Sequence, residues 1–314
     1  MKKVLLATTA VALSAGVAYA EVSISGNARM GLQYINPAVG ASTTTIEKRM
    51  TVDINATTES SSGITFGATM RLRSEENIAT FAAGARVFLQ TSGFELAMGN
   101  INGAIESMPG LYDPSVGLTG LGWGGMVTQV VGADLLSGPA DTDGHKYFAW
   151  DAYSSTGNGA EGVEVTYTAG AFSGHVSYSD GTANGLSGSG NGIKRAAAYG
   201  AYTMNDWTVA LGVQESNQVN EDKTILTVGG KIGDYSVGFG YADNEGVNKF
   251  ALNGSATFGA TTVSAYVADE DTAGTDTSYG LGVSYDLGGA SIVGGIAHTE
   301  LGADRADLGV SFSF

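Results

Sequence analysis

The residues Val22–Tyr34 read V-S-I-S-G-N-A-R-M-G-L-Q-Y. The even positions are apolar or small, from Val22 through Met30 to Tyr34, whereas the odd positions are mostly polar and include Arg29. Successive side chains of a β-strand point to opposite faces, so this alternation predicts a strand with one apolar and one polar face.

The same alternation recurs along the chain and predicts sixteen strands. Their expected ranges are 22–34, 45–57, 63–73, 83–91, 93–99, 162–169, 172–179, 194–204, 206–215, 223–232, 235–242, 248–258, 261–268, 277–286, 290–298 and 304–314. Short turns alternate with longer acidic or Gly/Ser-rich loops, which is typical of an antiparallel transmembrane β-barrel. A soluble β-sandwich also alternates, but sixteen hairpin-linked strands with long loops at one end only favour the barrel.

Composition excludes several classes of function. The 314 residues hold 15 Lys+Arg against 31 Asp+Glu, a net charge of −16, which argues against a nucleic-acid partner because phosphates are met by Lys and Arg. There is no cysteine, and the three histidines lie in no metal-binding or hydrolase motif. We therefore expect a protein that is not an enzyme.

The first twenty residues predict an export signal. Lys2 and Lys3 precede an apolar stretch that ends in Ala18-Tyr19-Ala20, an A-x-A cleavage pattern. An N-terminal membrane anchor is the alternative, but the apolar stretch is short for a span of about 20 residues. We expect a signal peptide at 1–20 and a barrel domain at 21–314, located in a Gram-negative outer membrane.

One connection is unusually long. Residues 100–161 lack good alternation, yet they include apolar residues such as Leu111, Trp123 and Met126. A long loop in a compact domain is usually functional or disordered, and apolar content does not suit a solvated loop. We expect this segment to fold back inside the barrel.

Several stretches carry a family resemblance, among them Gly26–Tyr34, Tyr279–Gly289 and Ala306–Phe314. In these the chain resembles the trimeric 16-stranded general porins of photosynthetic purple bacteria and related alphaproteobacteria. The resemblance implies a homotrimer in contact with lipid and lipopolysaccharide, whose water-filled channel passes small hydrophilic solutes and ions. It also implies that the terminal Phe314 is recognised by the barrel-assembly machinery. A substrate-selective channel and a structural or adhesin barrel stay open as alternatives.

Five of the seven arginines fall on the polar face of the first strands: Arg29, Arg49, Arg71, Arg73 and Arg86. An arginine facing lipid at mid-bilayer would cost about 2–4 kcal/mol, so we expect these side chains in the lumen. The family resemblance implies that a basic wall of this kind faces an acidic inserted loop, with Glu106 and Asp113 as the candidates here. A transverse field between such charges would set the selectivity of the channel.

Two further expectations concern the periphery. Strands one to five carry few outward aromatic residues and many methionines, which favours a protein neighbour there and hence the trimer contact.

Asp269, Asp271 and Asp276 lie in one acidic loop and could bind Ca²⁺ through oxygen ligands. The alternative for that loop is surface charge that meets lipopolysaccharide. No other cofactor is expected.

Overall fold

The computed structural model describes residues 20–76, 78–112, 116–131, 148–180 and 192–314. The first strands are β1 Ala20–Asn36, β2 Thr43–Glu59, β3 Thr65–Glu75, β4 Ile78–Ala82, β5 Arg86–Thr91 and β6 Phe94–Gly99. After the long loop follow β7 Gly162–Ala169, β8 Phe172–Asp180, β9 Lys194–Met204, β10 Trp207–Ser216, β11 Lys223–Ile232 and β12 Tyr235–Asn244. The last are β13 Val247–Phe258, β14 Thr261–Glu270, β15 Ser278–Asp286, β16 Ala290–His298 and β17 Asp304–Ser313. The predicted signal peptide lies outside the described residues, apart from Ala20.

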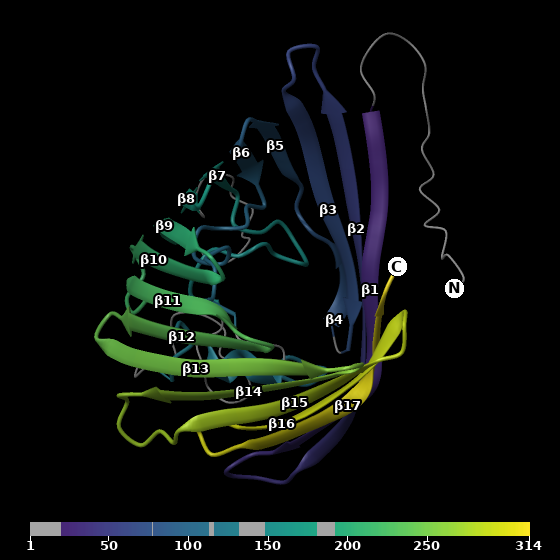
Figure 1. Ribbon diagram of the computed structural model, residues 1–314, viewed down its shortest axis with the longest axis vertical. Helices are drawn as coiled ribbons and strands as arrows, with labels where there is room; N and C mark the ends of the chain where they lie inside the picture. Colours follow the sequence, from purple (N-terminus) through teal and green to yellow (C-terminus); the bar gives the residue numbers. More distant parts are fainter. Residues whose placement is uncertain (1–19, 77, 113–115, 132–147, 181–191) are drawn as a thin grey trace.

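The strands close into one antiparallel barrel. Except for β4 and β5, each strand pairs with its neighbours in sequence, and β1 pairs with β17 as well as with β2. Gly26 and Phe314 complete this closure by exchanging backbone hydrogen bonds of 2.8 and 2.9 Å. Figure 1 shows β1, in purple, beside the yellow β17. Because β4 and β5 both pair with β3, the seventeen labels occupy sixteen strand positions, which confirms the predicted fold class.

The fourth position is interrupted because the end of the long loop enters the sheet there. The amide of Gly84 donates to the carbonyl of Gly157 at 2.6 Å, and the amide of Gly157 donates to that of Ala82 at 3.1 Å. A Cβ on Gly84 would lie 2.2 Å from the Asn158 carbonyl oxygen, so only glycine permits this approach. Alternation along 83–91 predicted the later part, β5, and missed β4.

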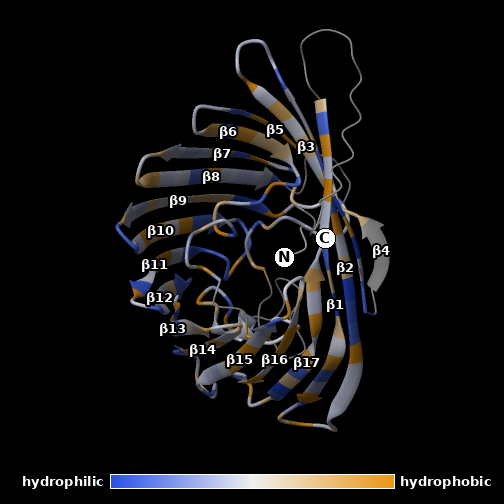
Figure 2. Ribbon diagram, turned by 45° about the vertical axis from the view of Figure 1, so that its right-hand side comes forward, coloured by the Kyte–Doolittle hydropathy of each residue, from blue (hydrophilic) through white to orange (hydrophobic). Residues whose placement is uncertain are grey.

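The outward face of the barrel is apolar. Along β15 the outward residues Tyr279, Leu281 and Val283 are 55%, 46% and 45% exposed, whereas the inward Ser278 is fully buried. Figure 2 shows the same alternation of hydrophobic and hydrophilic residues along β1. An apolar band around a closed barrel matches the hydrocarbon region of a bilayer. No helix among the described residues is long and apolar enough to cross a membrane.

The inside of the barrel is divided into two parts. Along β9–β16 most inward side chains in mid-strand are small and apolar, for example Ala210, Ala242 and Ala268. Ile105, Met108 and Val127 of the long loop pack on this wall and form a buried apolar cluster with it. Figure 1 shows the teal segment that follows β6 inside the ring of strands. The described parts of the loop therefore fill the β9–β16 side and leave space beside β2 and β3.

Candidate functional site: the channel beside β2 and β3

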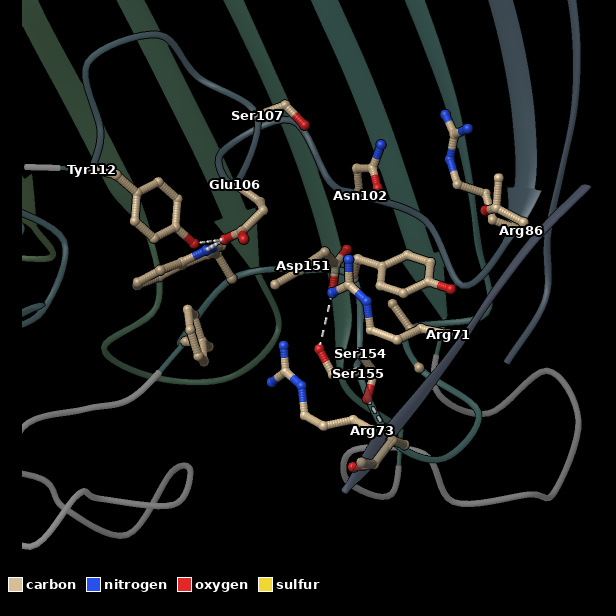
Figure 3. A pocket seen from close by; sticks show the side chains of 18 of the residues that line it. Arg71, Arg73, Arg86, Asn102, Glu106, Ser107, Tyr112, Asp151, Ser154 and Ser155 are labelled. Carbon is tan, nitrogen blue, oxygen red and sulfur yellow. Dashed lines mark hydrogen bonds between the residues drawn. The ribbon is translucent and has the colours of Figure 1, made fainter. Parts of the chain in front are cut away.

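A cavity of about 1410 Å³ lies between the inner face of β2 and β3 and the long loop. The strands contribute Arg49, Asp53, Arg71, Arg73 and Glu75 to its lining. The loop contributes Glu106, Tyr112 and the segment from Phe148 to Thr156. In Figure 3, Arg71 and Arg73 extend from β3 toward the side that carries Glu106 and Tyr112. This is the arrangement of a basic strand wall opposite an inserted loop.

Strand register places the wall charges next to one another. Arg49 stands opposite Glu75, and Asp53 stands opposite Arg71 in the β2–β3 ladder. The Arg49 Nη1 atom donates to Glu75 at 3.5 Å, while the Arg71 Nε atom donates to Asp53 at 2.7 Å. Arg73 lies opposite Thr51 and also lines the cavity. The wall is therefore a lattice of alternating charges, in which strand carboxylates hold the arginines in place.

The other two predicted arginines have different surroundings. Arg29 is absent from the cavity lining; its Nε donates to Glu47 at 2.7 Å and its Nη1 to the Leu118 carbonyl of the loop at 3.0 Å. Arg86 borders the cavity but is only 7% exposed, and its guanidinium is bound by Glu164 and Glu95. Of the five arginines that were predicted for the wall, Arg49, Arg71 and Arg73 present their charge most directly to the channel.

Glu106 lines the cavity but makes its contacts within the loop. Its Oε2 accepts hydrogen bonds from Trp150 Nε1, at 3.0 Å, and from the Tyr112 hydroxyl. Burial raises the pKa of Glu106, although these two hydrogen bonds act in the opposite direction. No ion pair joins Glu106 to a wall arginine in the part of the chain that the structure describes. Asp113, the second predicted acid, lies outside the described residues.

Buried polar groups fix the loop to the barrel. Lys249 Nζ donates to the carbonyls of Gly124 and Gln129 at 2.8 and 2.6 Å, and Asp307 accepts from the Thr119 amide at 2.7 Å. At the start of the loop, Glu164 accepts from the amides of Asn102 and Gly103 and from His175. Buried backbone groups need such partners, so these side chains determine where the loop lies.

The comparisons with known proteins agree with this geometry. The family of Gram-negative porins has a sequence model that matches residues 7–304. The chain belongs to the Gram-negative porin family. It is 34% identical over 330 residues to a porin of Rhodobacter capsulatus and 29% identical over 306 residues to a porin of Fuscovulum blasticum, with 94% of this chain and the whole of each relative covered.

Solved structures show the same relationship for this porin. A double mutant of Rhodopseudomonas blastica porin superposes with a TM-score of 0.76 at 27% identity, covering 93% of this chain and all of the other. A triple mutant of the same porin gives a TM-score of 0.75 at 26% identity and the same coverage. The protein is thus an outer-membrane channel rather than a member of an enzyme family, and the predicted family is confirmed.

Sequence reasoning missed one charged cluster of the porin that borders the channel. Arg195, on β9, donates to Glu221 at 2.8 Å from both Nε and Nη2, and its Nη1 lies 3.3 Å from Asp151 of the loop. Burial raises the pKa of Asp151, and the nearby Arg195 opposes that shift. Arg195 lies on the same inward face of β9 as Ala197 and Ala201. This alternation is the sequence signal from which Arg195 could have been predicted to face the lumen.

The three aspartates that were predicted to bind calcium make contacts within the protein. Asp269 accepts from the Thr277 hydroxyl, and Asp271 accepts two hydrogen bonds from Asn248. Asp276 lies 3.7 Å from His298. Each carboxylate thus has a separate partner, and no group of three or more His, Cys, Asp or Glu side chains among the described residues is placed to hold a metal ion. A calcium ion needs six to eight converging oxygen ligands.

Proposed function

We propose that this porin passes small hydrophilic solutes and ions by passive diffusion, and that the wall of Arg49, Arg71 and Arg73 together with the long loop sets its selectivity. The observation that carries the proposal is the cavity between that wall and the loop. Charged side chains on opposite sides of a narrow aqueous passage orient polar solutes and discriminate between ions. An apolar solute cannot form such interactions, and in a narrow passage it displaces water that solvates the charged side chains of the wall.

Selectivity between anions and cations should be weak in this channel. The described lining contains five arginines and five carboxylates, so its formal charge is zero. The net charge of −16 for the whole chain would favour cations, but only five of its 31 Asp and Glu residues line the described cavity. A permeating ion passes closer to the charges of the lining than to the charges at the mouth. Salt screens the field of the mouth charges beyond about 8 Å.

Loop deletion tests the proposal. Removing residues 104–152, with a short glycine–serine bridge in their place, should raise single-channel conductance in planar bilayers more than any point substitution. It should also raise the size limit for uptake of neutral sugars into liposomes. The matched control is the removal of 272–275 between β14 and β15, outside the cavity lining. Unchanged conductance and size limit after removal of 104–152 would show that the loop does not restrict the channel.

We further propose that the porin is a homotrimer that associates through the outer face of β1–β6. This arc exposes Met30, Met50, Met98 and Val87, each more than half exposed in the single chain. The aromatic residues that suit a lipid interface are concentrated on later strands, for example Tyr235 and Tyr279. Native mass spectrometry in mild detergent should give three copies, and Met30→Lys with Met50→Lys should give monomers. A monomeric wild-type porin would refute this assembly.

Export and membrane insertion complete the proposal. Residues 1–20 should direct the chain across the inner membrane and be removed after Ala20, which N-terminal sequencing of the mature porin tests. Phe314 should present the C-terminal strand to the barrel-assembly machinery, a role supported by its place at the seam with Gly26. Phe314→Ala should then lower the amount of folded porin in the outer membrane. The acidic outer loops should lie among the lipopolysaccharide headgroups.

A further inference from the structure

The loop presents an aromatic surface to the channel. Trp123 and Phe148 both line the cavity, and their rings meet edge to face with centroids 5.8 Å apart. Phe148 meets Trp150 in the same manner at 5.3 Å. Trp150 is only 2% exposed and its Nε1 is bound to Glu106, so it supports the Phe148 ring from the buried side. The three rings form one fixed surface, which we name the aromatic face.

The backbone at Phe148 is strained. Its φ angle is 51°, in the left-handed region that residues with a Cβ rarely adopt. Such strain persists only where the surrounding structure enforces it, and it is concentrated at functional sites. Here it accompanies a phenylalanine whose ring borders the channel and is only partly buried. Phe148 also packs against the buried apolar cluster, so its ring has one side on the loop and borders the cavity with another.

The strand wall supplies donors on the other side of the cavity. The Arg49 guanidinium, which has five N–H donors, donates one long hydrogen bond to Glu75. Arg71 is more fully engaged, since it binds Asp53 and Ser155 and lies 5.2 Å from the Tyr153 ring. Arg73 adds positive charge between them in the ladder. Arg49 is therefore the wall residue best able to bind a carboxylate that enters the channel.

The Glu106 carboxylate does not occupy the hydrogen-bond donors of Arg49. Both hydrogen bonds that its carboxylate accepts come from the loop itself, from Trp150 and Tyr112. Among the described residues, the loop thus turns rings rather than an unbound carboxylate toward the arginines. A solute that matches both sides needs a negative head and a planar apolar body.

We propose that the channel contains a binding site for small aromatic carboxylates. The ring of the solute packs on the aromatic face, and its carboxylate accepts hydrogen bonds from Arg49. This site rests on the proposed diffusion function and narrows it, because such solutes would be concentrated at the constriction relative to other anions. An aliphatic anion can use only the arginine, and a neutral sugar can use only the rings.

Block of single-channel KCl conductance by benzoate at neutral pH tests the site. Cyclohexanecarboxylate is the matched probe, since it has the same charge and carbon number but no π face, and acetate reports binding to the arginine alone. Benzoate should give a saturable block with a dissociation constant about threefold to tenfold below that of cyclohexanecarboxylate, the factor expected for one aromatic contact. Acetate should block more weakly than both.

Substitutions assign the contacts. Phe148→Leu keeps an apolar side chain on the same strained backbone and should remove the preference for benzoate over cyclohexanecarboxylate, whereas Phe148→Tyr should retain it. Phe239→Leu, on the outer face of β12, is the matched control. Arg49→Gln should weaken block by all three anions, and Lys231→Gln, at an exposed position of β11 outside the cavity lining, should not.

The outcomes separate the site from the function on which it rests. A wild-type porin that gives no conductance steps refutes the channel itself. A conducting porin that benzoate and cyclohexanecarboxylate block equally, or that retains its preference in Phe148→Leu, refutes the aromatic carboxylate site. Tighter block by glucose than by benzoate would also overturn it. Cold and boiled gel migration verifies that each variant is folded before recording.

Discussion

The Lys249 ammonium lies 2.6 Å from an oxygen of Glu300, and both side chains are completely buried inside the barrel. Glu270 lies 3.8 Å from the same nitrogen and accepts from the amide of Val131 in the loop. Lys249 also donates to two loop carbonyls, so one buried cation connects Glu270 of β14 and Glu300, between β16 and β17, with the inserted loop. The Lys249–Glu300 ion pair and the position of the inserted loop therefore depend on each other.

We expect Lys249→Met to destabilise the porin by about 3–5 kcal/mol, because removing one partner leaves buried carboxylates without their counter-charge. The loop should also lose its fixed position, so single-channel currents should fluctuate more. Thermal unfolding in detergent and bilayer recordings measure the two effects. Lys231→Met is the control, since Lys231 is exposed on β11. Equal melting of both variants would show that the Lys249 cluster does not stabilise the fold.

A second prediction concerns the close fit of the loop on β16. A Cβ on Gly295 would lie 2.7 Å from the Gly117 backbone nitrogen and 2.8 Å from its Cα. Gly295→Ala should therefore push the loop toward β2 and β3, lower conductance and cost about 1–3 kcal/mol of stability. A Cβ on Gly229 would meet only the Val237 oxygen, at 3.8 Å, so Gly229→Ala serves as control. If both variants conduct like wild type, the loop accommodates the methyl group without moving.

The barrel could be predicted from the sequence because each strand carries its two faces in its own residues. The polar parity of Arg49, Arg71 and Arg73 was enough to place them in the lumen, where the structure has them. Their partners Asp53 and Glu75 follow from hairpin register, which the strand ranges alone did not give.

The contacts that the long loop makes with the barrel could not be predicted from the alternation of residues along strands. Glu106 meets Trp150 across 44 residues, and Lys249 reaches Gly124 across 125 residues. No local period encodes these contacts, because they depend on how an irregular segment packs against the Ala-rich wall. For the same reason Glu106 seemed from the sequence to face the arginines, whereas it binds within the loop.

Glu106 should make selectivity depend on pH. Burial raises its pKa, so it takes up a proton at a pH above the ordinary value of 4.5. As pH falls through this raised pKa, the lining loses a negative charge and the reversal potential in a salt gradient should move toward anions. Protonation also relieves the burial penalty, so the contribution of Glu106 to folding is more favourable below its pKa and less favourable above it. In Glu106→Gln this step should disappear; an identical pH profile in that variant would assign the step to another group.

The wall itself gives the last prediction. Replacing Arg49 and Arg71 together by glutamine leaves Asp53 and Glu75 in the lining without their partners, so the lumen changes from balanced to negative. A change of two charges at about 8 Å in water lowers the energy of a permeating cation by about 1 kcal/mol and raises that of an anion by about the same amount. The ratio of cation to anion permeability should therefore rise by about thirtyfold before screening. Reversal potentials at low salt measure this ratio, and the shift should shrink as salt rises because the field is screened. Lys231→Gln is the control, because Lys231 is exposed on β11 outside the cavity lining and its replacement should leave the ratio unchanged. If the double variant keeps the wild-type ratio at low salt, the wall arginines do not govern selectivity and the field must come from charges at the mouth.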